Sequence, residues 1–145
     1  MTPTIDGLIR ASGLPRLTAR ALFEAASGRA REWLIAHGDE PSPADWQADY
    51  EALCCRFRDG EPLAYLVQWR EFHGRRFAVG PAVLIPRDDT AVLVDWAIER
   101  APRGGRVLEM ATGSGIIAVT LTLARPDLAL VATDLSPAAL RIAQA

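Results

Sequence analysis

The part of the sequence that most constrains the fold runs from residue 106 to residue 134. Residues 106–111 and 128–133 are two continuous apolar runs, and residues 116–124 between them form an apolar segment of helical length. Strands of a parallel sheet are covered on both faces, so they are apolar without alternation. The pattern therefore predicts a βαβ unit with two buried parallel strands.

A glycine-rich turn joins the first predicted strand to the helix, and an acid ends the second strand. The turn reads Ala111-Thr112-Gly113-Ser114-Gly115, and the acid is Asp134. Glycine lets a ligand lie against backbone amides at the positive end of a helix. An acid about 20 residues after the glycines is spaced to accept hydrogen bonds from a ribose diol. The unit is therefore expected to bind a nucleoside cofactor.

Two nucleoside cofactors are compatible with this pattern. The spacing Gly113-x-Gly115-x-x-Ala118 matches the fingerprint of a dinucleotide site, so NAD is one candidate. Glu109 lies just before the glycines, where a carboxylate repels a pyrophosphate but attracts the sulfonium and ammonium groups of S-adenosylmethionine. The order of acid, glycines and second acid favours S-adenosylmethionine. A tight turn followed by an ordinary surface Asp134 is the alternative that needs no ligand.

Composition excludes several classes of protein. The 145 residues are 50% hydrophobic and 23% charged, with a net charge of −2, which indicates a globular chain with no overall attraction to nucleic acid or membranes. The longest apolar run is too short to span a bilayer. The two cysteines, Cys54 and Cys55, are adjacent and form neither a disulfide framework nor a zinc site. We expect a cytoplasmic protein without a metal.

Residues 1–60 are predicted to form a helical domain. Apolar residues recur at helical spacing over residues 4–59, and Ser42-Pro43 reads as a capping hydroxyl followed by proline at the first helical position. Nothing in this region forms a catalytic constellation, so docking or regulation is its expected role.

The composition changes after Gly60. Residues 61–81 are rich in aromatic and β-branched residues around a His73-Gly74 turn, which predicts a hairpin within a linker of residues 61–87. The hairpin contains three arginines: Arg70, Arg75 and Arg76. They could bind an acidic partner or RNA. A solvent-exposed face of the hairpin is the better explanation for these charges, because no stacking aromatic residues alternate with them. Residues 88–145 would then form the cofactor-binding domain, beginning with a helix over residues 91–101.

Four segments occur together in one known family. They are Gly60-Glu61-Pro62-Leu63-Ala64-Tyr65-Leu66, Arg70-Glu71-Phe72-x-Gly74, Val83-Leu84-Ile85-Pro86-Arg87 and Val107-Leu108-Glu109-x-x-Thr112-Gly113-Ser114-Gly115. With these segments the chain resembles the bacterial peptide chain release factor N(5)-glutamine methyltransferases. The resemblance extends over essentially the whole chain.

The resemblance implies an α/β fold with a helical N-terminal bundle, a hairpin linker and the start of a Rossmann-like class I methyltransferase sheet. It implies S-adenosylmethionine as cofactor, held by residues 111–115 and Asp134, with Glu109 orienting the loop. The implied substrate is the glutamine of the Gly-Gly-Gln motif of release factors, without direct nucleic-acid or membrane binding. A ribosomal-protein glutamine methyltransferase and a non-catalytic release-factor-binding module are the alternatives.

The chain also departs from the family pattern. Ala111 and Gln68 stand where the family usually has glycine, and Asp88 stands where it usually has proline. The family's Asn-Pro-Pro-Tyr motif, which orients the substrate amide, has no counterpart, so no catalytic residue is assigned. From this we expect a protein truncated within its catalytic domain, carrying the cofactor site without the catalytic half.

Overall fold

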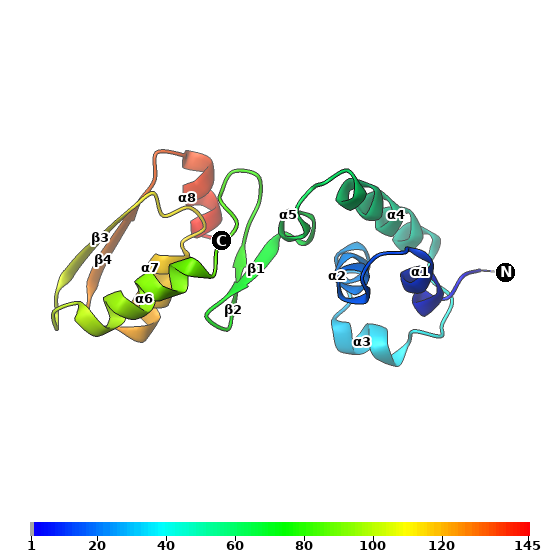
Figure 1. Ribbon diagram of the computed structural model, residues 1–145, viewed down its shortest axis with the longest axis horizontal. Helices are drawn as coiled ribbons and strands as arrows, with labels where there is room; N and C mark the ends of the chain where they lie inside the picture. The colour runs from blue at the N-terminus through cyan, green and yellow to red at the C-terminus, as the bar shows by residue number, and fades with distance from the viewer. Residues whose placement is uncertain (1) are drawn as a thin grey trace. The chain divides into compact units, whose positions relative to one another are not determined.

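The computed structural model describes residues 2–145, which divide into two compact units at residues 67 and 68 (Figure 1). Between residues 2 and 67 the first unit is built of helices, with one isolated β-bridge between Thr4 and Pro41, and the second unit contains both helices and strands. This confirms the predicted α/β class and the order of helices before sheet. No helix within residues 2–145 has the length and apolar character that a membrane span requires.

Five helices build the first unit: α1 (Ile5–Ala11), α2 (Arg16–Ser27), α3 (Arg31–Ala36), α4 (Ala44–Arg58) and α5 (Leu63–Val67). Helix α2 packs against each of the other four. Its residues Leu22 and Phe23 are completely buried, and the Phe23 ring lies 4.9 Å from the ring of Tyr50 on α4. The helical unit therefore has a hydrophobic core of its own.

The caps of these helices differ from the one cap expected from the sequence. Thr4 caps α1, because its Oγ1 accepts a hydrogen bond from the Gly7 amide at 3.1 Å. The prediction that the Ser42 hydroxyl caps α4 is wrong. Pro43 occupies the capping position, and the buried Ser42 hydroxyl donates to the Pro43 carbonyl instead. The Gln47 side-chain amide donates a hydrogen bond to the Ser42 carbonyl at 2.7 Å. The hydroxyl and the carbonyl of the buried Ser42 therefore form hydrogen bonds without capping the helix.

The predicted hairpin begins later than the sequence suggested. Residues 63–67 form helix α5, and its Leu66 is buried in the core of the helical unit. The helical unit therefore extends to Val67 rather than to residue 60, and the strands are confined to β1 (Trp69–Phe72) and β2 (Arg75–Ala78). A five-residue apolar run fits a helix or a strand equally well, and here packing against α2 decides for the helix.

The second unit contains the hairpin followed by α6 (Asp89–Arg100), β3 (Arg106–Met110), α7 (Ile116–Ala124), β4 (Ala129–Thr133) and α8 (Pro137–Ala143). Two residues connect β1 to β2, His73 with φ +48° and Gly74 with φ +68°, as a type I′ turn requires. Phe72 and Phe77 of the hairpin share a buried cluster with Val94 of α6 and Ile116 of α7.

Strands β3 and β4 are parallel, with Leu108 opposite Val131 and Met110 opposite Thr133, so the predicted βαβ unit is confirmed. Helices α6, α7 and α8 all lie to the same side of this sheet (Figure 1). The expectation that both faces would be covered is wrong for this structure, because Leu108, Met110 and Val131 are 59–77% exposed. An apolar face of the sheet is therefore open.

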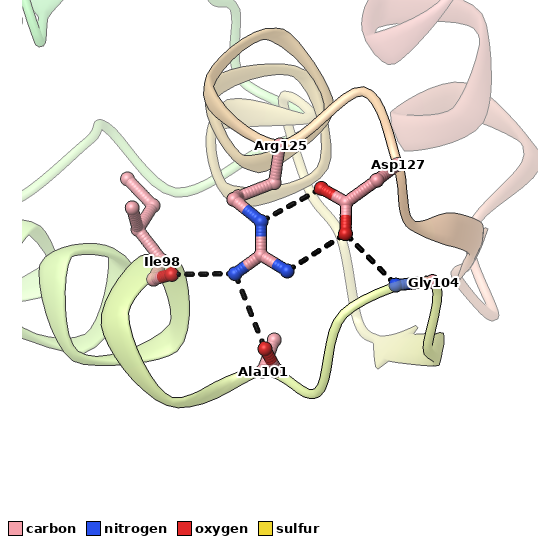
Figure 2. Close-up of polar contacts among 5 residues, drawn as sticks. All are labelled: Ile98, Ala101, Gly104, Arg125 and Asp127. Atoms are coloured by element: carbon pink, nitrogen blue, oxygen red, sulfur yellow. Dashed lines mark hydrogen bonds and ion pairs between the residues drawn. The ribbon is translucent and has the colours of Figure 1, made fainter.

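Arg125 and Asp127 fasten the loops at the amino ends of these two strands (Figure 2). The Arg125 guanidinium forms a bidentate pair with Asp127 at 2.7 and 2.8 Å and donates to the Ile98 and Ala101 carbonyls at the end of α6. Asp127 also accepts the Gly104 amide at 2.8 Å. This clip joins the loop before β3 to the loop before β4.

Candidate cofactor site

The predicted site residues come together where β3 and β4 end. The loop of residues 111–115 follows β3 directly, and its Thr112 amide donates to the Thr133 carbonyl at the end of β4, at 2.9 Å. Asp134 comes next along the chain after Thr133. The two predicted halves of the site, the glycine loop and the second-strand acid, therefore share the carboxyl edge of the sheet, where ligands of open α/β sheets bind.

Asp134 is bound to the glycine loop through its carboxylate. Oδ2 accepts the Gly113 amide at 2.9 Å, and Oδ1 accepts the Ser136 amide at 2.8 Å. Backbone hydrogen bonds from Ser136 and then Gly113 lower the pKa of Asp134 below its ordinary value, so the carboxylate is ionised at neutral pH. A carboxylate has about four lone-pair sites, so each oxygen can still accept a hydrogen bond from a ligand.

Glu109 lies on β3 just before the loop and is 9% exposed. Its Oε2 accepts a hydrogen bond from the Thr112 hydroxyl at 2.9 Å. Burial raises the pKa of Glu109, while the Thr112 hydroxyl and the Ala118 backbone act in the opposite direction. This carboxyl group holds Thr112 from within the fold, which agrees with a residue that orients the loop.

The loop backbone has left-handed conformations at Ala111, Gly113 and Gly115, with φ of +58°, +57° and +77°. A β-carbon on Gly113 would have no described atom of residues 2–145 within 4 Å, so the backbone there is open to a ligand. A β-carbon on Gly115 would lie 3.2 Å from the β-carbon of Ala143 on α8. Gly115 therefore permits both the start of α7 and the approach of α8.

The site residues differ in how accessible they are. Thr112, Ser114 and Gly115 are buried, whereas Ala111 is exposed and Gly113 and Asp134 are half-buried. The accessible surface thus combines open backbone with an ionised carboxylate, which suits a ligand carrying hydroxyl or ammonium donors. Among residues 2–145, no cluster of three or more potential metal ligands was found.

Ser136 has a role that the sequence did not reveal. It caps α8, because its Oγ accepts the Ala139 amide at 3.2 Å. Its own amide also orients Asp134. The signal for this was present, since an Asp side chain commonly bonds to the backbone two residues further on.

Known proteins resemble this chain along its length. A family model described as the PrmC N-terminal domain matches residues 7–67. The release factor glutamine methyltransferase of Bordetella pertussis is 46% identical over 142 residues, covering 97% of this chain and 53% of the relative. That of Escherichia coli is 41% identical over 137 residues, covering 94% and 50%.

A crystal structure of the release factor-specific protein-(glutamine-N5) methyltransferase from Alicyclobacillus acidocaldarius is 51% identical. The match covers 47% of this chain and 44% of that chain, with a TM-score of 0.32.

The chain spans about half the length of the curated relatives it matches. The relatives have one name in common, and their similarity covers the helical unit, the hairpin and the βαβ unit. The resemblance seen in the sequence motifs is therefore confirmed: the chain is similar to the release factor glutamine methyltransferases over nearly all of its own length and carries a match to the PrmC N-terminal domain at residues 7–67.

Proposed function

We propose that this chain supplies the methyl-donor site and the substrate-docking domain of a release factor glutamine methyltransferase. S-adenosylmethionine would bind at residues 111–115, with Asp134 accepting hydrogen bonds from its ribose hydroxyls. The observation that supports this most is the bond between Asp134 and the Gly113 amide, because it fixes an ionised acceptor beside an open stretch of backbone.

The hydrogen bonds of the loop favour S-adenosylmethionine over a dinucleotide. A pyrophosphate needs backbone amides that point outward. Three amides of this loop are already donated within the protein, from Thr112 to Thr133, from Gly113 to Asp134 and from Gly115 to Thr112. The ionised Asp134 would also repel a phosphate. S-adenosylmethionine has no phosphate and carries two cationic groups, so neither objection applies to it.

The docking role is proposed for the helical unit. It folds around a core of its own, and it contains the match to the PrmC N-terminal domain. We propose a release factor as the protein that it contacts, since the relatives are named for that substrate. The reaction would then take place in the cytoplasm, where translation ends.

Methyl transfer can be tested in a chimera. Residues 1–145 would replace the matching part of the Bordetella pertussis relative, and transfer of a tritiated methyl group from S-adenosylmethionine to a release factor would be measured. A release factor whose Gly-Gly-Gln glutamine is changed to alanine is the matched control substrate. We expect methylation of the normal factor only. A folded chimera that binds S-adenosylmethionine but labels both factors equally, or neither, would contradict the proposed substrate.

A further inference from the structure

The hairpin β1–β2 carries a concentration of positive charge that the cofactor site does not use. Its ten residues include three arginines and one glutamate, whereas the whole chain has a net charge of −2. Arg70 is paired with Asp88 at 3.3 Å. Arg75 and Arg76, both on β2 and both exposed, have no ion pair with an acid among residues 2–145. Two arginines of β2 therefore remain available to a partner.

Arg76 is held in place by an aromatic ring. Its guanidinium carbon lies 4.0 Å from the centre of the Trp69 ring on the neighbouring strand. Stacking on an aromatic face reduces the freedom of the side chain while the edge of the guanidinium can still donate hydrogen bonds. Such an arginine suits the bidentate binding of a carboxylate.

Strand β2 also has an open backbone edge. In an antiparallel pair, hydrogen-bonded and non-bonded residue pairs alternate. The Val79 amide donates to the Gln68 carbonyl at 3.1 Å, which sets this alternation along the register from Trp69↔Ala78 to Phe72↔Arg75. The backbone groups of Arg76 and Ala78 consequently point away from β1, and within residues 2–145 no further strand pairs with β2.

We propose that the open edge of β2 binds an extended acidic segment of a partner protein, which adds to the hairpin as a third strand. Successive side chains of a strand point to opposite faces, so Arg75 and Arg76 lie on different faces of the hairpin. Two consecutive acids in the added strand would therefore each face one arginine. The open edge of β1 is unsuited to this partner because it presents Glu71.

A peptide fits this surface better than RNA does. The ring of Trp69 is half-buried and covered by Arg76, so it offers no platform for a base. Glu71 lies opposite Arg76 in the hairpin and Asp88 is paired with Arg70, so acids stand among these arginines and would repel a continuous phosphate backbone. Two separate carboxylates can be matched to two arginines without meeting these acids.

The test is a nitrogen-15 NMR titration of the full 145-residue chain with the peptide acetyl-Thr-Val-Asp-Glu-Val-Thr-amide. We expect saturable shifts of the Arg76 and Ala78 amides. A double variant, Arg75→Glu with Arg76→Glu, should bind roughly tenfold more weakly, because two attractive cross-strand pairs become repulsive. The matched control is Arg100→Glu with Arg103→Glu, which changes the charge equally elsewhere in the same unit and should bind like the wild type.

A second peptide with the same side chains but N-methylated on alternate residues tests the backbone contacts. It should bind much more weakly, since it cannot form the strand ladder. The proposal is overturned by the absence of saturable binding, by equal losses in both double variants, or by equal binding of the N-methylated peptide. Tighter binding of a ten-nucleotide oligouridine at the same residues would also overturn it. Without peptide binding, the charges would serve only to keep β2 from pairing with other chains.

Discussion

Within residues 2–145, three residues other than glycine adopt a backbone conformation for which glycine is favoured: His73 in the hairpin turn, and Ala111 and Gln68. Ala111 has φ +58° and Gln68 has φ +64°, and both stand where the resemblance led us to expect glycine. A side chain in the left-handed region brings its β-carbon close to the following carbonyl oxygen, at a cost of about 1–2 kcal/mol. The glycine loop is therefore strained at its first residue.

Replacing Ala111 with glycine should stabilise the second unit. Relief of the backbone strain exceeds the extra entropy of glycine in the unfolded chain, so we expect a net gain of about 1 kcal/mol. In a unit of this size that corresponds to a rise in Tm of about 4–8 °C. Ala132→Gly is the matched control, because Ala132 is not among the residues with positive φ, and glycine there should lower the Tm. A lower Tm for Ala111→Gly would show that the loop is not strained.

Burial of Glu109 makes the stability of this unit depend on pH. Its folded-state pKa is raised, so the favourable contribution of the neutral carboxyl is complete below the unfolded pKa of about 4.3 and is lost as pH rises through the folded pKa. Glu109→Gln remains neutral at every pH. The Tm of this variant should equal that of the wild type at about pH 4 and exceed it at about pH 8. Thermal melts at both pH values measure this, and a difference that is independent of pH would contradict it.

At the scale of elements, the sequence predicts well what is local and apolar. The βαβ unit was predicted because two apolar runs and a glycine turn specify it without help from distant residues. The predicted start of the hairpin was wrong because the sequence of residues 63–67 fits a helix or a strand equally well. Burial of Leu66 against other helices favours the helix. Neither the Arg125 clip nor the open sheet face could be predicted, since both depend on which segments meet in space.

The hydrogen bonds between Arg125 and Asp127 lead us to expect that two Arg→Lys substitutions will change the Tm to different extents. Arg125→Lys keeps the charge but cannot form the bidentate pair with Asp127 while also bonding to the end of α6. The Tm of the second unit should therefore fall. Arg141→Lys, at an exposed position on α8 with no ion pair or side-chain hydrogen bond among residues 2–145, is the control and should leave the Tm unchanged. Equal melting of the two variants would show that the clip contributes nothing to stability.

The exposed apolar face of the β3–β4 sheet is expected to promote self-association of the chain. Leu108 is 63% exposed and Val131 is 59% exposed, so neither contributes much to the core. Threonine at both positions should reduce self-association, measured by light scattering, with little change in Tm. Val94 is completely buried, so Val94→Thr should cost about 1–3 kcal/mol because its hydroxyl is left without a partner. Unchanged association of the double variant would show that this face is not adhesive.

For the whole molecule, the division into two units separates the two proposed tasks. Residues 109–136, which build the cofactor site, all belong to the second unit, and the match to the PrmC N-terminal domain ends with the first. Each unit has a buried cluster of its own. Cofactor binding should therefore be visible in the 145-residue chain, independently of any protein substrate.

The most direct test is a nitrogen-15 NMR titration of the chain with S-adenosylmethionine, repeated with NAD. We predict saturable shifts of the Gly113, Gly115 and Ser136 amides with S-adenosylmethionine and none with NAD. Asp134→Ala should weaken binding roughly ten- to a hundredfold, for the loss of charge-assisted bonds of about 1.5–3 kcal/mol, while Asp95→Ala should not. Equal shifts with NAD, or unchanged affinity in Asp134→Ala, would contradict the assignment of this loop to S-adenosylmethionine.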